Sequence, residues 1–282
     1  MTVLIDAGNT RIKLDWLKEG SGHRAGNLLA AGLDDKDAIR RWLSELPQPP
    51  SSAIGVNVAG PNTAALVQEA LGCPVKWFAS APDSFGVRNG YREPGQLGAD
   101  RWAAMLGLAW HEQQRRAGQP LDAAAALLAT FGTATTIDTL RPLDEQHASA
   151  ERWQRFEFPG GLIFPGPEMM TAALTTGTAN LPHAYGDIAL FPTHTHQAIA
   201  TGVAAAQAGG LLRQWLAGIE LCGAPPVVYV SGGGWPLVSD EVDRMLADAR
   251  RRLHLPLQPV QWLEAPVLDG LARLAVLTSQ AY

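Results

Sequence analysis

Near its amino terminus the sequence reads Val3-Leu4-Ile5-Asp6-Ala7-Gly8-Asn9-Thr10-Arg11-Ile12-Lys13. A short apolar run leads into a glycine turn and a second run follows it, which predicts a strand, a tight turn and another strand. The turn offers backbone N–H groups, the Thr10 hydroxyl and the Lys13 ammonium, which are donors that bind a phosphate chain. Asp6, at the end of the first strand, has the chemistry to hold Mg²⁺ directly or through water. An ordinary hairpin turn is the alternative interpretation of these residues.

The composition is that of a globular protein with a substantial core. The chain has 282 residues, enough for one large or two ordinary domains, and 46% of them are hydrophobic. The net charge of −5 argues against nucleic acid as a main partner, because proteins that bind it normally carry a basic face. The two cysteines, Cys73 and Cys222, match neither a disulfide framework nor a zinc-binding spacing.

The sequence shows no targeting or membrane segment. Charged side chains at Asp6, Arg11 and Lys13 interrupt any apolar core of a signal peptide. No apolar stretch approaches the ~18 residues that a membrane span needs. We therefore expect a cytoplasmic protein without a membrane partner.

The order of apolar patterns predicts an α/β layered domain in the first half of the chain. Apolar residues recur at helical spacing over 35–46, and Pro47 ends this helix. Alternating strands and helices, which are typical of an α/β domain, follow it. We expect strands at 53–58 and 75–78, helices at 62–71 and 100–116, and a glycine-rich loop at 86–98.

The second half of the chain repeats the opening pattern. A strand at 124–131, the turn Gly132-Thr133-Ala134 and a strand at 135–140 echo the first hairpin. This repeat suggests a duplication with a cleft between the halves, and we expect domains at 1–118 and 119–282 with a linker at 117–120. The remaining elements are expected as strands near 156–158, 227–230 and 257–262 and helices from about 167, 193, 236 and 269.

The common nucleotide-binding motifs do not occur in this sequence. It contains neither the G-x-x-x-x-G-K-[ST] of a P-loop nor a G-x-G-x-x-G that opens a helix after a strand. A pair of glycine-turn hairpins is another kind of ATP site. In the second hairpin, Thr133 can donate to a phosphate oxygen beside the Gly132 amide, and Asp138 can help to organise a metal ion. A plain turn is again the alternative.

A candidate general base stands at the start of the long helix. The sequence Gly98-Ala99-Asp100-Arg101 places a carboxylate near the free amides and the positive end of the helix. Asp100 is thus a candidate proton acceptor, and Arg101 is a candidate partner for an anionic group of the acceptor. A role for Asp100 in the first turn of the helix alone is the alternative.

Two further glycine-rich segments stand outside the hairpins. The segment 159–167 is too rich in glycine and proline for ordinary packing, which suggests a backbone that passes close to a ligand or a partner subunit. Ser231-Gly232-Gly233-Gly234 follows a predicted strand and would let a flat base approach the backbone.

Taken together, five motifs resemble those of the type III pantothenate kinases, in that family's order. They are Asp6 to Lys13, Tyr91 with Leu97-Gly98-Ala99-Asp100-Arg101, Gly132 to Asp138, Gly160-Gly161 with Pro165-Gly166, and Thr178-Ala179 with Leu181-Pro182. The resemblance implies an α/β fold of two ribonuclease H-like domains, as in actin-like ATPases, with a central ATP cleft. It also implies phosphorylation of pantothenate at its primary hydroxyl, the first step of coenzyme A biosynthesis. Members of the family form homodimers and need Mg²⁺ and a monovalent cation.

The resemblance also implies roles for particular residues. Asp100 would accept the proton, and Asp6 would lie near Mg²⁺. ATP would be bound by Asp6, Ala7, Gly8, Asn9, Thr10, Arg11, Ile12, Lys13 and Thr133. Pantothenate would be bound by Tyr91, Gly98, Ala99, Asp100, Arg101 and Thr178.

One position departs from the family pattern. The family usually has Asp two residues before the second hairpin's glycine, where it binds the monovalent cation, and this chain has Thr130 there. A need for K⁺ or NH₄⁺ is therefore open.

Two other functions are left open by the residues. One is a non-catalytic regulatory or transcriptional accessory protein that retains the nucleotide cleft, and the other is a related kinase that acts on another small alcohol. An intact Asp100 and two hairpins favour an enzyme, because a binding module alone does not need a base.

Overall fold

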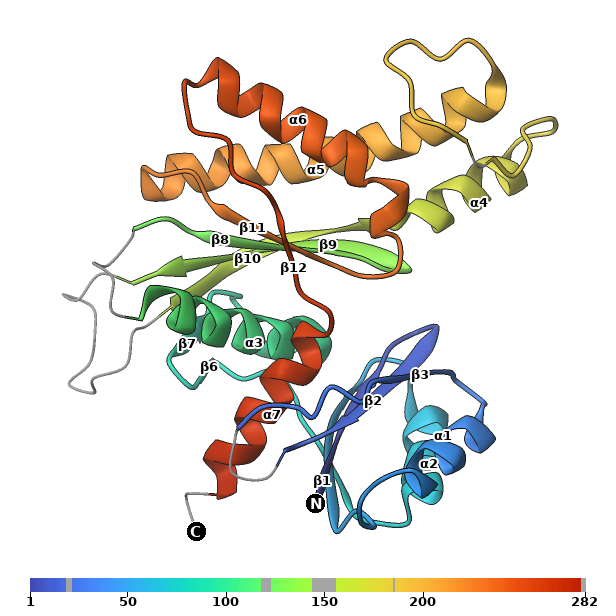
Figure 1. Ribbon diagram of the computed structural model, residues 1–282, viewed down its shortest axis with the longest axis vertical. Coiled ribbons are helices and arrows are strands. Elements are labelled where there is room, and N and C mark those ends of the chain that lie inside the picture. Colours follow the sequence, from blue (N-terminus) through green and yellow to red (C-terminus); the bar gives the residue numbers. More distant parts are fainter. Residues whose placement is uncertain (19–21, 118–122, 144–155, 185, 280–282) are drawn as a thin grey trace. The chain divides into compact units, whose positions relative to one another are not determined.

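A computed structural model describes residues 1–18, 22–117, 123–143, 156–184 and 186–279 of the chain (Figure 1). Its internal contacts divide the chain into two compact units. Unit 1 comprises Met1–Pro120, Leu143–Phe158 and Ala265–Tyr282, and unit 2 comprises Leu121–Pro142 and Pro159–Glu264.

The sheet of unit 1 has five strands in the order β3-β2-β1-β4-β5. β1 pairs antiparallel with β2 and parallel with β4. On the outer sides, β3 pairs antiparallel with β2, and β5 pairs parallel with β4. This is the strand order of a ribonuclease H-like unit. The strands are β1 (Thr2–Ala7), β2 (Arg11–Trp16), β3 (Leu29–Gly32), β4 (Ser52–Asn57) and β5 (Val75–Trp77).

Five neighbouring strands of a second, seven-stranded sheet repeat this order as β10-β9-β8-β11-β12. β8 pairs antiparallel with β9 and parallel with β11, and β11 pairs parallel with β12. The duplication suggested by the two hairpins is therefore present in the topology, and the predicted α/β class with two ribonuclease H-like units is confirmed. The strands are β8 (Ala126–Phe131), β9 (Ala134–Pro142), β10 (Phe156–Pro165), β11 (Val227–Ser231) and β12 (Gln261–Trp262).

Helices cover both faces of the unit 1 sheet. Figure 1 shows α1 and α2 on one face and α7 on the other, and α7 contacts β1, β2 and β4. α7 also lies against α3, where the backbones approach so closely that a Cβ at Gly107 would collide with the Pro266 carbonyl and one at Gly270 with the Ala103 carbonyl. The helices are α1 (Lys36–Ser44), α2 (Pro61–Leu71), α3 (Ala99–Arg116) and α7 (Pro266–Ser279).

Two helices of unit 2, α5 (Thr195–Cys222) and α6 (Ser239–Arg252), lie over the same face of its sheet (Figure 1). α5 buries one stripe at helical spacing, including Ala204, Leu211 and Trp215, against Phe131 and Ile137 of the hairpin strands. The short α4 (Pro167–Gly177) follows β10, and the 3₁₀ turn η3 (Trp235–Leu237) precedes α6.

Several predicted boundaries were wrong. The expected loop 86–98 contains the strand β7 (Val87–Asn89) and the 3₁₀ turn η1 (Pro94–Gln96), and β7 forms a hairpin with β6 (Asp83–Ser84). β7 becomes a strand because it pairs in parallel with Phe156–Phe158, a partner distant in sequence. The strand expected at 257–262 is formed only by its last two residues.

The last helix starts at Pro266 rather than at residue 269, because a proline is well tolerated in the first turn of a helix. The linker expected at 117–120 lies, apart from Ala117, outside the described residues, and the domain boundary at 118/119 stays a prediction. The contacts group the final helix α7 with unit 1. Cys73 and Cys222 are free thiols.

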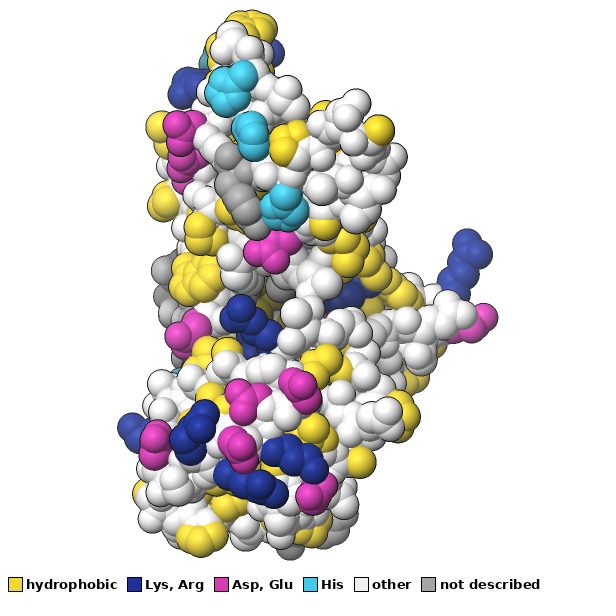
Figure 2. Space-filling model, turned by 90° about the vertical axis from the view of Figure 1, so that its right-hand side faces the viewer, with side chains coloured by type: hydrophobic (Ala, Val, Ile, Leu, Met, Phe, Trp, Pro, Cys, Tyr) yellow, Lys and Arg dark blue, Asp and Glu magenta, His cyan; other side chains and the backbone are white. Residues whose placement is uncertain are grey.

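The described surface of unit 1 mixes charges of both signs. Figure 2 shows Lys and Arg side chains interspersed with Asp and Glu on the side of this unit that α1 and α2 occupy. Lys36 pairs with Glu69 at 2.6 Å and Arg40 with Asp37 at 3.6 Å. Exposed pairs of this kind contribute little to stability. Among the helices that the structure describes, none combines the length and the apolar character that a membrane span needs.

Candidate functional site

The first predicted hairpin is present, with Asp6 and Lys13 directly opposite each other. Asp6 on β1 is the register partner of Lys13 on β2, so both side chains lie on the same face of the sheet. The turn closes with the Gly8 amide donating to the Arg11 carbonyl at 3.1 Å. The side chains of Asn9 and Thr10 are exposed at its tip. The hairpin therefore presents a turn, a cation and a carboxylate at one edge of unit 1.

Asp6 is the most perturbed acid of this group. Burial raises the pKa of its carboxyl to about 6; Lys13 opposes this shift and the charge of Asp100 adds to it. Asp6 is half-buried, and the ionised form of its carboxyl is costly because burial removes part of its hydration. Strong perturbation beside other charged groups is typical of functional sites. The two carboxylates and Lys13 thus interact within one unit although they come from β1, β2 and α3.

Asp100 is the second residue of α3, after Gly98 at the N-cap. Its Oδ1 accepts a hydrogen bond of 2.8 Å from the amide of Arg101, and no other described residue is hydrogen-bonded to its carboxylate. A Cβ at position 98 would lie 2.6 Å from this same oxygen. Glycine at 98 therefore leaves the room that the carboxylate occupies. Gly98 and not Asp100 is the N-cap, and Asp100 lies in the first turn of the helix, so a role in that turn alone stays the alternative to a general base.

Arg101 is buried and held by two aromatic rings. Its Nη1 donates to the Tyr91 hydroxyl at 2.9 Å, and its guanidinium carbon lies 5.9 Å from the Tyr91 ring centroid and 5.7 Å from that of Phe158. The two rings are stacked with their centroids 5.7 Å apart. Cation–π contacts at such distances are favourable and orient the guanidinium.

Two residues of this cluster were not found from the sequence. Phe158 is a core-like aromatic in β10, and only the pairing of β10 with β7 brings it beside Tyr91. Asn89 is buried; its Oδ1 accepts from the Tyr91 amide at 3.0 Å and its Nδ2 donates to the Ala81 carbonyl at 3.1 Å. The sequence Asn89-Gly90-Tyr91, which is typical of a turn, was the local feature that could have indicated a role for Asn89.

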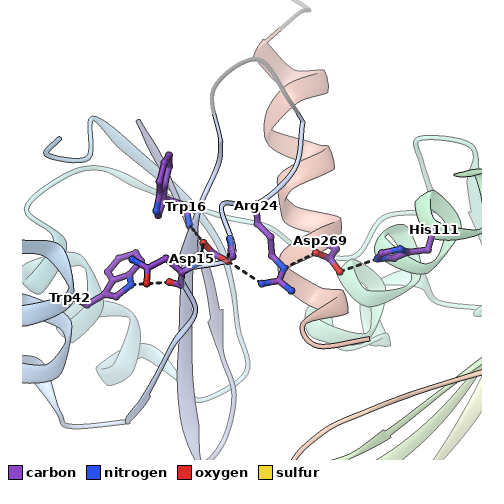
Figure 3. Close-up of polar contacts among 8 residues, drawn as sticks. Asp15, Trp16, Arg24, Trp42, His111 and Asp269 are labelled. Carbon is purple, nitrogen blue, oxygen red and sulfur yellow. Dashed lines mark hydrogen bonds and ion pairs between the residues drawn. The ribbon is translucent and has the colours of Figure 1, made fainter. Parts of the chain in front are cut away.

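A polar network ties together the elements that carry Lys13 and Asp100. Arg24 donates from Nη1 to Asp15 Oδ2 on β2 at 3.1 Å and from Nε to Asp269 Oδ1 on α7 at 2.8 Å. The other oxygen of Asp269 lies 3.0 Å from Nε2 of His111 on α3 (Figure 3). Asp15 is fully buried, and a buried carboxylate needs such partners. The network thereby holds β2 and α3 to the same helix.

In unit 2, the second hairpin is present and receives the glycine-rich segment. The Gly132 amide donates to the Ala134 carbonyl at 3.1 Å, and the Gly166 amide donates to the Thr133 carbonyl at 2.9 Å. A Cβ at Gly166 would collide with the Gly132 carbonyl. The sequence predicted that the backbone of segment 159–167 passes close to a ligand or a partner subunit. At Gly166 the structure shows that this backbone passes close to the second hairpin. The Thr133 side chain is exposed.

The other unit 2 candidates occupy helix and strand ends. Gly232 has a φ of 97°, and a Cβ there would collide with the Phe131 carbonyl, so the Gly232–Gly234 turn lies against the end of β8. Thr178 is exposed at the C-cap of α4; its hydroxyl donates to the Leu174 carbonyl at 2.8 Å and accepts from the Leu181 amide at 3.3 Å.

Thr130 belongs to a row of hydroxyl side chains across unit 2. Its register partners are Thr136 on β9 and Ser231 on β11, so the three side chains share one face of the sheet. Ser231 is buried and the two threonines are half-buried. Neutral oxygens therefore gather where the family pattern has a carboxylate. Within the described ranges, no group of three or more His, Cys, Asp or Glu side chains is placed to hold a metal ion.

Comparison with known proteins gives a consistent family. The family model of the type III pantothenate kinase matches residues 2–216. A type III pantothenate kinase of Bordetella pertussis is 47% identical over 98% of this chain and 97% of its own length. One of Verminephrobacter eiseniae is 34% identical over 98% of both chains. A solved Campylobacter jejuni structure, described as a Baf family transcriptional activator, shares the fold with a TM-score of 0.53 at 14% identity, over 99% of each chain.

Proposed function

This chain belongs to the type III pantothenate kinase family, and we propose that it transfers the γ-phosphoryl group of ATP to the primary hydroxyl of pantothenate. The product is 4'-phosphopantothenate, the first intermediate of coenzyme A biosynthesis. The observation that carries this proposal is the 47% identity over 98% of the chain to a curated type III pantothenate kinase. The interacting group of Asp6, Lys13 and Asp100 supports it, because a non-catalytic regulatory protein would not need two adjacent carboxylates beside a cation.

We propose that the β1–β2 hairpin binds the phosphates of ATP. The turn amides, the Thr10 hydroxyl and Lys13 are donors suited to phosphate oxygens, and Thr133 supplies a further hydroxyl. Phosphoryl transfer depends mainly on positioning and on neutralising charge. Lys13 serves the second need, since it is already placed opposite Asp6.

The chemistry of Asp6 fits Mg²⁺. A half-buried carboxylate whose pKa is raised to about 6, with the charge of Asp100 adding to the shift, is a position that a divalent cation would stabilise. Mg²⁺ commonly takes one or two carboxylates together with substrate phosphates, so a cage of three protein ligands is not required. When bound, the ion supplies positive charge at the phosphate oxygens.

We propose that Asp100 accepts the proton of the attacking hydroxyl and that Tyr91, Gly98, Ala99, Arg101 and Thr178 bind pantothenate. The Asp100 carboxylate accepts a hydrogen bond from the Arg101 amide, which orients it. The guanidinium of Arg101 is the anion partner for the acceptor. Its position beside the stacked rings of Tyr91 and Phe158 favours a planar, bidentate contact with a carboxylate.

A coupled assay of ATP turnover tests the activity. We expect turnover that depends on pantothenate and that other small alcohols do not replace. Absence of pantothenate-dependent turnover with K⁺, NH₄⁺ or neither would favour the regulatory alternative. Turnover with a different alcohol would instead keep the kinase and change its acceptor.

The same assay tests the cation. We expect K⁺ or NH₄⁺ to change the rate by less than about tenfold, because the hydroxyls of Thr130, Thr136 and Ser231 carry no net charge to attract a cation. Thr130→Asp is expected to increase the stimulation by K⁺, and Thr130→Asn serves as the uncharged control. Strong K⁺ dependence of the unmodified protein would contradict this prediction.

Replacement of Arg101 tests the acceptor site. Arg101→Lys is expected to raise the KM for pantothenate by about tenfold or more, since an ammonium cannot make the forked, stacked contact. The KM for ATP should change little. Tyr91→Phe removes only the 2.9 Å hydrogen bond and should raise the KM for pantothenate by a smaller factor of about 2–10. An equal rise in both KM values would argue against the role of Arg101, and circular dichroism checks the fold of each variant.

We further propose a homodimer. Unit 2 exposes apolar side chains on β10, α4 and the segment before α5. They are Ile163 (63% exposed), Met169 (43%), Leu190 (72%) and Phe191 (82%). Figure 2 shows hydrophobic and histidine side chains on the side of unit 2 that holds α4. Exposed apolar patches mark interaction surfaces. Sedimentation should give twice the chain mass of 30.1 kDa, and Phe191→Glu should lower it. A monomer at micromolar concentration would contradict the proposal.

A further inference from the structure

Unit 1 contains a cavity that the proposed reaction does not use. It has a volume of about 330 Å³ and lies among α3, α7 and the β6–β7 hairpin. Leu106, Ala109 and Trp110 of α3 and Leu277 of α7 form apolar walls. Trp110 is ten residues from Asp100, which corresponds to ~15 Å along the helix. The volume is at the lower end of those that bind small molecules.

Two charges of opposite sign line this cavity. Arg273 of α7 is half-buried, and Asp83 of β6 is exposed. Within the described part of the chain, neither side chain has a hydrogen bond or an ion pair, whereas four other arginines of unit 1, Arg24, Arg88, Arg115 and Arg116, are paired with carboxylates. A half-buried cation without a partner is costly, and a ligand anion would relieve that cost. The cavity is therefore lined by one positive and one negative side chain, each without an ion-pair partner among the described residues.

Phe85 stands in a turn that disfavours it. Ser84 and Val87 are register partners, so Phe85 and Gly86 form a two-residue hairpin loop with φ values of 49° and 81°. Positive φ at both positions is the type I′ turn, which favours Asn, Asp or Gly at the first position. Core packing does not account for a phenylalanine here, because its side chain is 41% exposed. Its ring lines the cavity instead, and backbone strain that persists in this way is typical of ligand sites.

We propose that this cavity binds a small zwitterion with an apolar body, of the class of aromatic or branched α-amino acids. Its carboxylate would pair with Arg273 and its ammonium with Asp83. Its apolar part would lie against Phe85, Leu106 and Trp110. A cation and an anion in one cavity with apolar walls select this class over a simple anion, which Asp83 would repel, and over a simple cation, which Arg273 would repel.

Calorimetric titration of the full chain with three matched probes tests the proposal. The probes are L-phenylalanine, 3-phenylpropionate, which lacks the ammonium, and phenethylamine, which lacks the carboxylate. We expect L-phenylalanine to bind most tightly. Arg273→Gln should weaken its binding by about tenfold, since a hydrogen-bonded charge is lost. Asp83→Asn should weaken it by only ~3-fold, because its charge is exposed. Arg40→Gln, an exposed arginine on α1, is the control and should bind as the unmodified protein does.

Phe85→Asn separates a ligand role from a structural one. Asparagine suits the type I′ turn, so the melting temperature should stay the same or rise. The affinity for L-phenylalanine should fall about fivefold or more. The proposal is overturned if no probe binds at millimolar concentration, if all three bind alike, or if Arg273→Gln binds as tightly as the control. A lower melting temperature with unchanged affinity in Phe85→Asn would equally overturn it. None of these readouts requires turnover of ATP, so they are independent of the proposed kinase activity.

Discussion

Asp100→Asn is expected to lower kcat by about 10²–10⁴-fold, which is the usual contribution of a general base. Asparagine retains the size of the side chain and can still accept the 2.8 Å hydrogen bond from the Arg101 amide. The helix start and the position of Arg101 should therefore persist. The lost property is the ability to take a proton. The KM for ATP and the melting temperature should change little, and steady-state kinetics with thermal unfolding measures all three.

Asp37→Asn is a matched control for this prediction. Asp37 is the second residue of α1, just as Asp100 is the second residue of α3, so both variants remove a charge from the same helical position. The side chain of Asp37 is 79% exposed and has only the weak pair with Arg40. Its loss should leave kcat unchanged. Full activity of Asp100→Asn, or an equal loss in both variants, would remove Asp100 from the role of base.

The parts of the site that depend on local sequence could be predicted. The turn between Asp6 and Lys13 follows from a strand pattern interrupted by Gly8, and the place of Asp100 follows from a glycine before a long helix. Both rest on contacts between residues close in the chain. The duplication was visible for the same reason, because each unit starts with its own hairpin.

The parts that depend on distant pairing could not be predicted. Arg24 and Asp269 are 245 residues apart, and no periodicity connects them. Phe158 stacks on Tyr91 only because β10 pairs with β7, which itself looked like loop from its glycine-rich surroundings. The membership of α7 in unit 1 is a further case, since it depends on the close approach of Gly107 and Gly270 to the facing backbones. Tertiary contacts decide such features, and local preference does not reveal them.

The second large effect concerns Asp6, where activity and stability should move in opposite directions. Asp6→Asn is expected to reduce kcat by at least ~100-fold, since it removes the carboxylate proposed to lie at the metal and the phosphates. The metal-free variant should nevertheless be more stable than the unmodified protein at pH 7.5. Burial is the main reason, because it raises the pKa of Asp6 from 3.8 to about 6, and Asn has no charge to bury.

The pH dependence of this gain has a definite sign. Below pH 3.8 the carboxyl is protonated in both the folded and the unfolded chain, so it contributes no difference. Between pH 3.8 and about 6 the folded chain holds a proton that the unfolded chain has lost, so the stability of the unmodified protein falls as pH rises. Above about pH 6 the cost is complete, at up to about 3 kcal/mol for a shift of this size. This value already includes the opposing effect of the Lys13 charge on the pKa of Asp6.

Urea unfolding without Mg²⁺ at pH 4, 5, 6 and 7.5 measures this difference. We expect the free energy of unfolding of Asp6→Asn to exceed that of the unmodified protein most at pH 7.5 and to converge with it near pH 4. Asp37→Asn, which removes an exposed carboxylate, should show no such trend. A variant that is less stable at every pH, or a gap that does not change with pH, would mean that the Asp6 charge is not buried at a cost. The expected outcome would instead show that the fold tolerates a destabilising carboxylate because phosphoryl transfer needs it there.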